Sequence, residues 1–191
     1  MYTKVSIPKA GDGAGSAAIK DPNIILVDVD DILTEPTRSH GDVALTGDIT
    51  LKEGAKAIGI YATPSTIEMT EEYSGDPDAR GVMQGVKFDH PGNSVAIKNF
   101  TEANLNRGFV ALVKECDGTS TGRMHYVGSK CNPLSITPET TNTKDAQKRT
   151  FTFKQEIAGR FLPGEYSGAI PTLAGSTAES DGESGDDGES A

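Results

Sequence analysis

The chain has 191 residues, of which 35% are hydrophobic and 6% aromatic, and it contains no tryptophan. This length favours one domain with tails or two small domains, and the low apolar share limits the core. The formal net charge of −10 disfavours binding to phosphate backbones, which proteins hold with Lys and Arg. The longest apolar run, Ile24–Val27, is too short to cross a bilayer, and the N-terminus lacks a signal-peptide core. We therefore expect a non-membrane protein made in the cytoplasm.

The first third of the chain predicts a flexible arm followed by short strands. Residues 1–22 are rich in Gly and Ala, which build no core, so they predict the arm. Residues 23–29 form an apolar run that predicts a strand. A polar connection over 34–42 leads to two further predicted strands, at 43–51 and 56–62.

The middle of the chain predicts a long β-hairpin and then one helix. Residues 65–73 and 81–90 predict the two strands, and the polar turn formers between them predict a wide, mobile tip. Thr101 is the predicted N-cap of a helix of about two turns, and Gly108 is its predicted C-terminal stop.

The last third predicts more strands and an acidic tail. Strict alternation from Arg149 to Gln155 is typical of a half-buried strand. Residues 137–145 are polar and predict a turn-like segment. The other expected strands are 109–115, 123–130, 134–136 and 146–155. From Gly175 onward there are six acidic residues and no Lys or Arg, a composition that predicts disorder.

The two cysteines suggest neither a metal site nor a redox motif. Cys116 and Cys131 lie fifteen positions apart and form no CxxC pair. We expect two buried free thiols, with a disulfide between adjacent strands as the alternative.

One segment resembles an enzyme motif. The strand ending in Asp28-Val29-Asp30 resembles the first motif of haloacid-dehalogenase-type phosphatases, in which the first Asp attacks a phosphoryl group beside Mg²⁺. Those enzymes need a parallel sheet with covering helices, and this chain predicts a single short helix. We interpret the motif as the end of an edge strand with solvated carboxylates.

Other chemistry-bearing residues also lack a catalytic or metal-binding pattern. Asp76 and Asp78 lack EF-hand spacing, and the three histidines, His40, His90 and His125, are expected at the surface. We therefore expect no enzyme activity, cofactor or metal. A group of basic residues is interpreted as a solvated strand face. The alternative is a subunit interface complementary to Asp28, Asp30, Asp31, Asp76 and Asp78. The basic residues are Lys144, Lys148, Arg149, Lys154 and Arg160.

From about Ile58 to Tyr166, the order of the elements resembles the tail tube (major tail) proteins of long-tailed bacteriophages, whose fold is shared with type VI secretion tube proteins. Ile67–Tyr73 looks like the strand that opens the family's long hairpin, Asp76–Arg80 like its acidic loop, and Gln84–Lys87 like the returning strand. Phe100–Asn106 lies where the family has its single helix. Tyr126–Lys130 and Thr150–Lys154 resemble its later strands.

The resemblance implies an all-β fold with one short helix. This is a β-sandwich or barrel of the phage tail tube type, with a long hairpin and extended termini. The implied domains are an arm over 1–22, a tube domain over 23–168 and an acidic disordered tail over 169–191. The implied protein is a structural virion subunit of hexameric rings, stacked as the tail tube through which DNA is ejected. Its implied partners are itself and the terminator, tape measure and distal tail proteins, with DNA only as transiting cargo and no membrane.

The same resemblance places the protein in the virion tail after synthesis in the host cytoplasm. We expect the hairpin tip to contact the next ring through Asp76, Asp78 and Arg80. The acidic body predicts a net negative bore, with Lys and Arg mostly at subunit contacts. The alternative function is capsid decoration or another virion adhesive module, and a magnesium-dependent phosphatase is the remote alternative.

Overall fold

A computed structural model describes residues 5–9, 11, 15–39, 41–116 and 122–175. These residues are mostly β-sheet with one α-helix, α1 (Val95–Asn104), which confirms the all-β expectation. The strands are β1 (Ile19–Lys20), β2 (Asn23–Asp28), β3 (Ile32–Thr34), β4 (Thr50–Leu51), β5 (Ile58–Tyr61), β6 (Glu68–Ser74), β7 (Gly81–Pro91), β8 (Gly108–Cys116), β9 (Met124–Val127), β10 (Leu134–Asn142), β11 (Gln147–Gln155) and β12 (Gly164–Tyr166).

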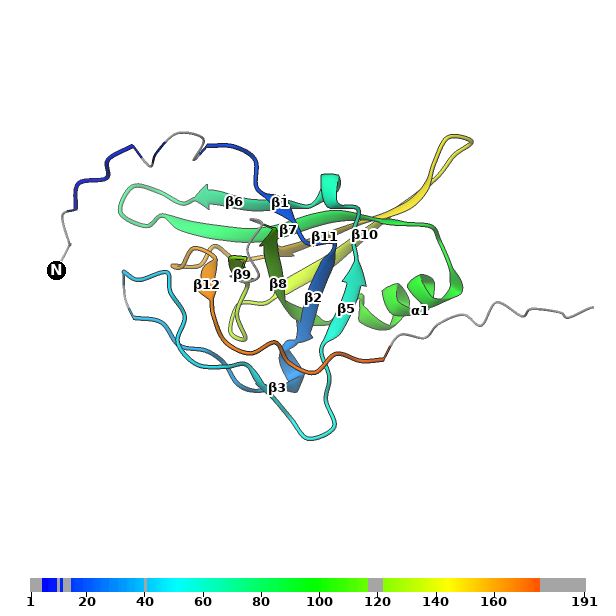
Figure 1. The fold of residues 1–191 in the computed structure, drawn as a ribbon, viewed down its shortest axis with the longest axis horizontal. Coiled ribbons are helices and arrows are strands. Elements are labelled where there is room, and N and C mark those ends of the chain that lie inside the picture. The colour runs from blue at the N-terminus through cyan, green and yellow to red at the C-terminus, as the bar shows by residue number, and fades with distance from the viewer. Residues whose placement is uncertain (1–4, 10, 12–14, 40, 117–121, 176–191) are drawn as a thin grey trace, which may run out of the picture.

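Two strand layers meet at β8. In one layer, β10, β11, β7 and β6 pair in that order, all antiparallel. In the other, β5 pairs with β2, β2 with β8, β8 with β9, and β9 with β12. The layers join where β10 pairs with β8 at Leu134 and Ser135. Figure 1 shows the long β6–β7 and β10–β11 hairpins lying across β2, β8 and β5.

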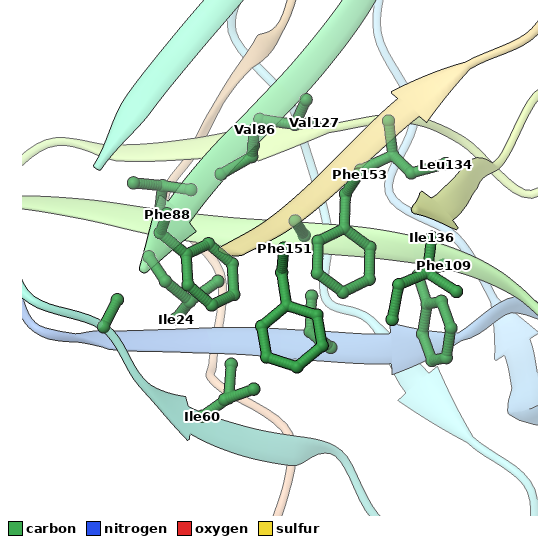
Figure 2. Packing of buried hydrophobic residues seen from close by; sticks show 14 of the residues in the cluster. Ile24, Ile60, Val86, Phe88, Phe109, Val127, Leu134, Ile136, Phe151 and Phe153 are labelled. Atoms are coloured by element: carbon green, nitrogen blue, oxygen red, sulfur yellow. The ribbon is translucent and has the colours of Figure 1, made fainter. Parts of the chain in front are cut away.

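An aromatic core fills the space between the layers. Phe88, Phe109, Phe151 and Phe153 are all fully buried. The ring centroids of Phe88 and Phe153 lie 5.9 Å apart, and Phe109 meets Phe153 edge to face at 5.8 Å. Figure 2 shows these rings among aliphatic residues such as Ile24 and Leu134. The alternation along β11 therefore places its two phenylalanines in the core, as predicted.

A second core lies on the far face of β2 and β8. Ile25 and Val27 of β2 contribute to it, whereas Ile24 and Leu26 face the aromatic core. Ile32, Leu45 and Ile49 cover this second face from the 32–57 segment. Strands buried on both faces read as continuous apolar runs, which explains the sequence of β2. The expectation that β2 is an edge strand is wrong, because it pairs with β5 on one side and β8 on the other.

The helix begins earlier than predicted. Ser94 is its N-cap and accepts a hydrogen bond from the Ile97 N–H at 3.4 Å. Thr101 is not a cap: it is buried inside the helix, where its hydroxyl donates to the Ile97 carbonyl at 2.6 Å. Both residues have a hydroxyl that suits an N-cap, and packing of Ile97 against the core selects the earlier one.

The strands differ from the predictions in several places. The predicted strand at 43–51 is irregular except for Thr50–Leu51, because its apolar side chains Leu45 and Ile49 cover a core face without pairing in a ladder. The segment after Ile136 is not a turn. β10 continues to Asn142 because each of its residues pairs with β11. β12 was not predicted, and its three residues pair with β9.

The ends of the expected arm and tail also pair with the body. Ile19 and Lys20 pair with Cys116 and Glu115 of β8. Leu173 bridges Ala57, and further hydrogen bonds hold residues 169–174. The acidic stretch 176–191 lies outside the described residues. Both cysteines are free, but both are exposed, so the expectation of buried thiols is wrong.

Candidate assembly surface

Two strands of the four-stranded layer have an open edge. β6 pairs only with β7, across seven residues from Glu68 to Ser74. β10 pairs with β11 along all nine residues but with β8 only at its first two, Leu134 and Ser135. Within the described part of the chain, Glu68–Ser74 and Ile136–Asn142 thus lack a strand on their outer sides. Open edges present unpaired N–H and C=O groups that pair readily with another chain.

The hydrogen bonds of β7 reveal which groups of β6 point outward. Val82 exchanges two 2.8 Å backbone bonds with Gly159, and the Gln84 N–H donates to Gln155 Oε1 at 3.0 Å. These β7 residues thus direct their backbone groups away from β6. In an antiparallel pair, the residue opposite such a position also directs its groups away. Tyr73 and Glu71, which lie opposite Val82 and Gln84, therefore present N–H and C=O at the open edge.

The same alternation assigns the open edge of β10. Val86 lies four residues after Val82, so its backbone N–H and C=O also point away from β6. Val86 is opposite Phe153 of β11, so the backbone groups of Phe153 bond toward β7. Thr152 then bonds toward β10, and Pro138 of β10, opposite Phe151, faces the open edge. Proline has no N–H and is confined in sheets to positions of this kind. Its presence at Pro138 therefore agrees with an outward-facing position on an edge strand.

The outer face of the four-stranded layer is polar. It lies opposite the face that carries Phe88, Phe151 and Phe153, and side chains alternate between the two faces. Apart from Met83, Pro91 and glycines, its residues are hydroxylic or charged. They are Glu68, Thr70, Glu72, Ser74, Lys87, Asp89, Ser135, Thr137, Glu139, Thr141, Lys148, Thr150, Thr152 and Lys154.

Two lysines on this polar face form ion pairs. Lys154 Nζ lies 2.8 Å from Glu72 Oε2, and Lys148 Nζ lies 2.5 Å from Asp89 Oδ2. Thr150 also donates to Asp89 at 2.6 Å. Partial burial raises the pKa of Asp89, but the hydrogen bonds from Lys148 and Thr150 outweigh it, so the pKa lies below its usual value. Asp89 is thus held as a carboxylate.

The predicted contact residues lie together at one hairpin tip. Asp76, Asp78 and Arg80 are all exposed, and none forms a side-chain hydrogen bond or ion pair within the described residues. Asp78 has a φ of 71°, a turn conformation that Asp tolerates. The β10–β11 tip, at residues 143–146, lies at the other end of the same layer, because Gln147 bonds to Gly92 beyond the end of β7.

The basic residues of the alternative interface do not all lie on one face. Lys148 and Lys154 are paired within the chain, as described above. Arg149 is buried, with Nη1 2.6 Å from the Thr101 hydroxyl and Nη2 2.9 Å from Asn93 Oδ1. The strand alternation places Arg149 on the opposite face from its two lysine neighbours, which composition alone did not reveal.

Asp28 of the Asp-x-Asp motif caps a short 3-10 helix at Val29–Asp31 and forms a salt bridge. Asp28 accepts the Asp30 N–H at 2.9 Å, and its other oxygen lies 2.5 Å from Arg107 Nη1. Asp28 is buried, which corrects the expectation of a solvated carboxylate. No group of three or more His, Cys, Asp or Glu among the described residues is placed to hold a metal ion.

A cleft that the sequence did not predict lies beside the layer. It has a volume of about 390 Å³ and is lined in part by Arg38, Gln84, Tyr126 and Phe161. The Arg38 guanidinium stacks 4.4 Å from the Phe161 ring centroid and donates to the Leu162 carbonyl at 2.8 Å. Gln84 is buried. Its side-chain oxygen accepts a hydrogen bond from the Gly128 N–H, and its side-chain nitrogen donates to the Phe161 carbonyl. These contacts anchor residues 159–164 to the edge of the layer.

Comparisons with known proteins add no relative: no protein-family model, curated protein or solved structure matches this chain. Of the helices in the described residues, none has the length and apolar character needed to cross a membrane.

Proposed function

We propose that the protein is a structural virion subunit that closes into rings stacked as a phage tail tube. The observation that carries the proposal is the pair of open edges, β6 and β10, on opposite sides of one four-stranded layer. A subunit with a different free edge on each side pairs head to tail with its neighbours, and such heterologous contacts form a ring when the rotation between neighbours closes. The resemblance in element order to tail tube proteins supports a ring of six.

The strand directions support this closure. β10, β11, β7 and β6 alternate in direction, so β10 and β6 run opposite ways. When the rotation axis that relates neighbouring subunits runs roughly parallel to the strands, β10 of the neighbour lies beside β6 and runs antiparallel to it. With Glu71 opposite Thr140, which shares the outward parity of Pro138, Tyr73 lies opposite Pro138, whose carbonyl can accept although it has no N–H to donate. Apart from the N–H that Pro138 lacks, these intersubunit pairs repeat the ladder found within the subunit.

The thickness of the subunit determines which face lines the bore. Six subunits contribute twenty-four strands, and at about 4.8 Å per strand the backbone circle measures about 115 Å around and about 37 Å across. Strand tilt widens this further, and barrels of this size enclose a water-filled channel. The β5–β2–β8 layer, α1 and the 32–57 segment are too thick to fit six times inside. The polar face is therefore the bore wall.

The hairpin tips suit contacts between successive rings. The β6–β7 and β10–β11 tips project from opposite ends of the layer, so stacking brings one against the neighbouring ring. Asp76, Asp78 and Arg80 have no partner among the described residues and are free for that contact. We propose that these three residues form the inter-ring contact.

Electron microscopy of the purified chain tests ring formation, with a matched pair of variants at the β6 edge. Glu71→Pro removes an N–H that points outward and leaves the β6–β7 ladder intact, whereas Glu71→Gln keeps that N–H. We expect rings or tubes from the wild type and E71Q, and folded unassembled subunits from E71P by circular dichroism. Rings from E71P, or monomers from the wild type at high concentration in several salts, would contradict the proposal. A compact trimer that binds capsids would instead favour capsid decoration.

Deletion of residues 75–79 tests stacking separately from ring closure. The deletion leaves both open edges in place, so single rings should persist while tubes are lost. Tubes of normal length from this variant would show that the tip has no inter-ring role.

A further inference from the structure

The lysines on the polar face determine how a bore built from it treats DNA. Three lysines lie on this face, Lys87, Lys148 and Lys154. Lysine is the side chain that binds phosphates by releasing their counterions, so a wall with free lysines would hold the DNA backbone. Resting on the proposed function, we infer that carboxylates of the same face neutralise these lysines, two of them in direct ion pairs, so that the wall lets duplex DNA slide.

Each lysine has its own carboxylate neighbour. Lys148 of β11 pairs with Asp89 of the neighbouring strand β7 at 2.5 Å. Lys154 of β11 pairs at 2.8 Å with Glu72 of β6, which is one strand further away. Lys87 lies directly opposite Glu68 in the β6–β7 register, which places the two charges beside each other on the same face without a direct ion pair. All three carboxylates belong to β6 or β7. The long hairpin thus supplies the negative charges, and the lysines come from β7 and β11.

The charge balance of the face leaves it slightly acidic. Four carboxylates, Glu68, Glu72, Asp89 and Glu139, face three lysines, a net charge of −1 for each subunit. In the proposed ring these three lysines line the bore and do not lie at subunit contacts. Lys148 and Lys154 stabilise the layer through ion pairs between strands, and the carboxylates prevent them from acting as phosphate ligands.

Removing the carboxylates should convert the wall into a DNA-binding surface. The double variant Glu72→Gln/Asp89→Asn frees two lysines and changes the face from four carboxylates to two, a net charge of +1 for each subunit. Six or more phosphate contacts weaken by about 10³-fold between about 50 and 200 mM salt. We expect E72Q/D89N tubes to retain fluorescent duplex DNA with this salt dependence and to protect it from nuclease, whereas wild-type tubes retain none.

Two controls separate the bore wall from general charge. Glu53→Gln/Glu102→Gln makes the same charge change at exposed carboxylates that have no partner among the described residues and lie off the polar face. These tubes should retain no DNA. Adding Lys148→Met and Lys154→Met to E72Q/D89N removes the freed lysines and should abolish retention.

The outcomes are distinguishable by imaging the same samples. If wild-type chains form no tubes, the proposed function is wrong. If tubes form but E72Q/D89N retains no more DNA than the wild type, or E53Q/E102Q retains as much, this inference is wrong. Should the double variant fail to assemble, tubes of the single variant E72Q must show weaker retention of the same kind, because Glu72 is half exposed and replaceable.

Discussion

Thr101 offers a sharp test of the structure, because the sequence assigns it a cap and the fold assigns it a buried bond. Its hydroxyl donates to the Ile97 carbonyl and accepts from Arg149 Nη1, both at 2.6 Å. Thr101→Val keeps the shape but leaves the charged donor without this partner. Removing a hydrogen bond made by a buried charged group lowers the free energy of unfolding by about 1.5–3 kcal/mol. For a chain of this size, about 2 kcal/mol lowers the melting temperature by about 4–8 °C.

Urea unfolding of the unassembled chain measures this cost, and a double-mutant cycle assigns it. Arg149→Met removes the guanidinium, so Thr101→Val should cost at least about 1 kcal/mol less in that background. Thr101→Ser keeps the hydroxyl and should stay within about 1 kcal/mol of the wild type. A Thr101→Val variant as stable as the wild type, or one whose cost is unchanged by Arg149→Met, would refute the buried bond.

Three further predictions follow from packing and charge. Phe153→Ala removes a fully buried ring that contacts three others and should cost about 3–5 kcal/mol in urea unfolding; a cost below about 1 kcal/mol would contradict the core. Partial burial raises the pKa values of Asp89 and Glu115, yet the hydrogen bonds from Lys148 to Asp89 and from Lys20 to Glu115, and the His125 ring 3.0 Å from Glu115, depress both overall. Their stabilisation is complete above the unfolded values of 3.8 and 4.5 and is lost as pH falls below them, so D89N/E115Q should flatten acid unfolding. An unchanged acid limb would count against these pairs. Both cysteines should react with a thiol reagent without denaturant, since both are exposed and free; a single reactive thiol would be inconsistent with this.

The local pattern predicted elements where one periodicity dominates. Alternation along Arg149–Gln155 predicted β11, and turn formers between two alternating runs predicted the β6–β7 hairpin. The pattern was insufficient for α1, because Ser94 and Thr101 are both acceptable caps and only packing of Ile97 separates them. It was also insufficient for β10, whose polar residues after Ile136 are strand only because β11 pairs with them.

The candidate assembly surface depended on the tertiary structure even more strongly. The sequence alone determined an all-β chain with one helix, a long polar-tipped hairpin carrying Asp76, Asp78 and Arg80, and a formal net charge of −10. Register decided the rest, because pairing sets which face each side chain occupies and which backbone groups point outward. Arg149 is buried while Lys148 is paired on the opposite face, although they are neighbours in sequence. The open edge of β10 exists only because the layers separate after Ser135, a property of the packed fold that no local pattern encodes.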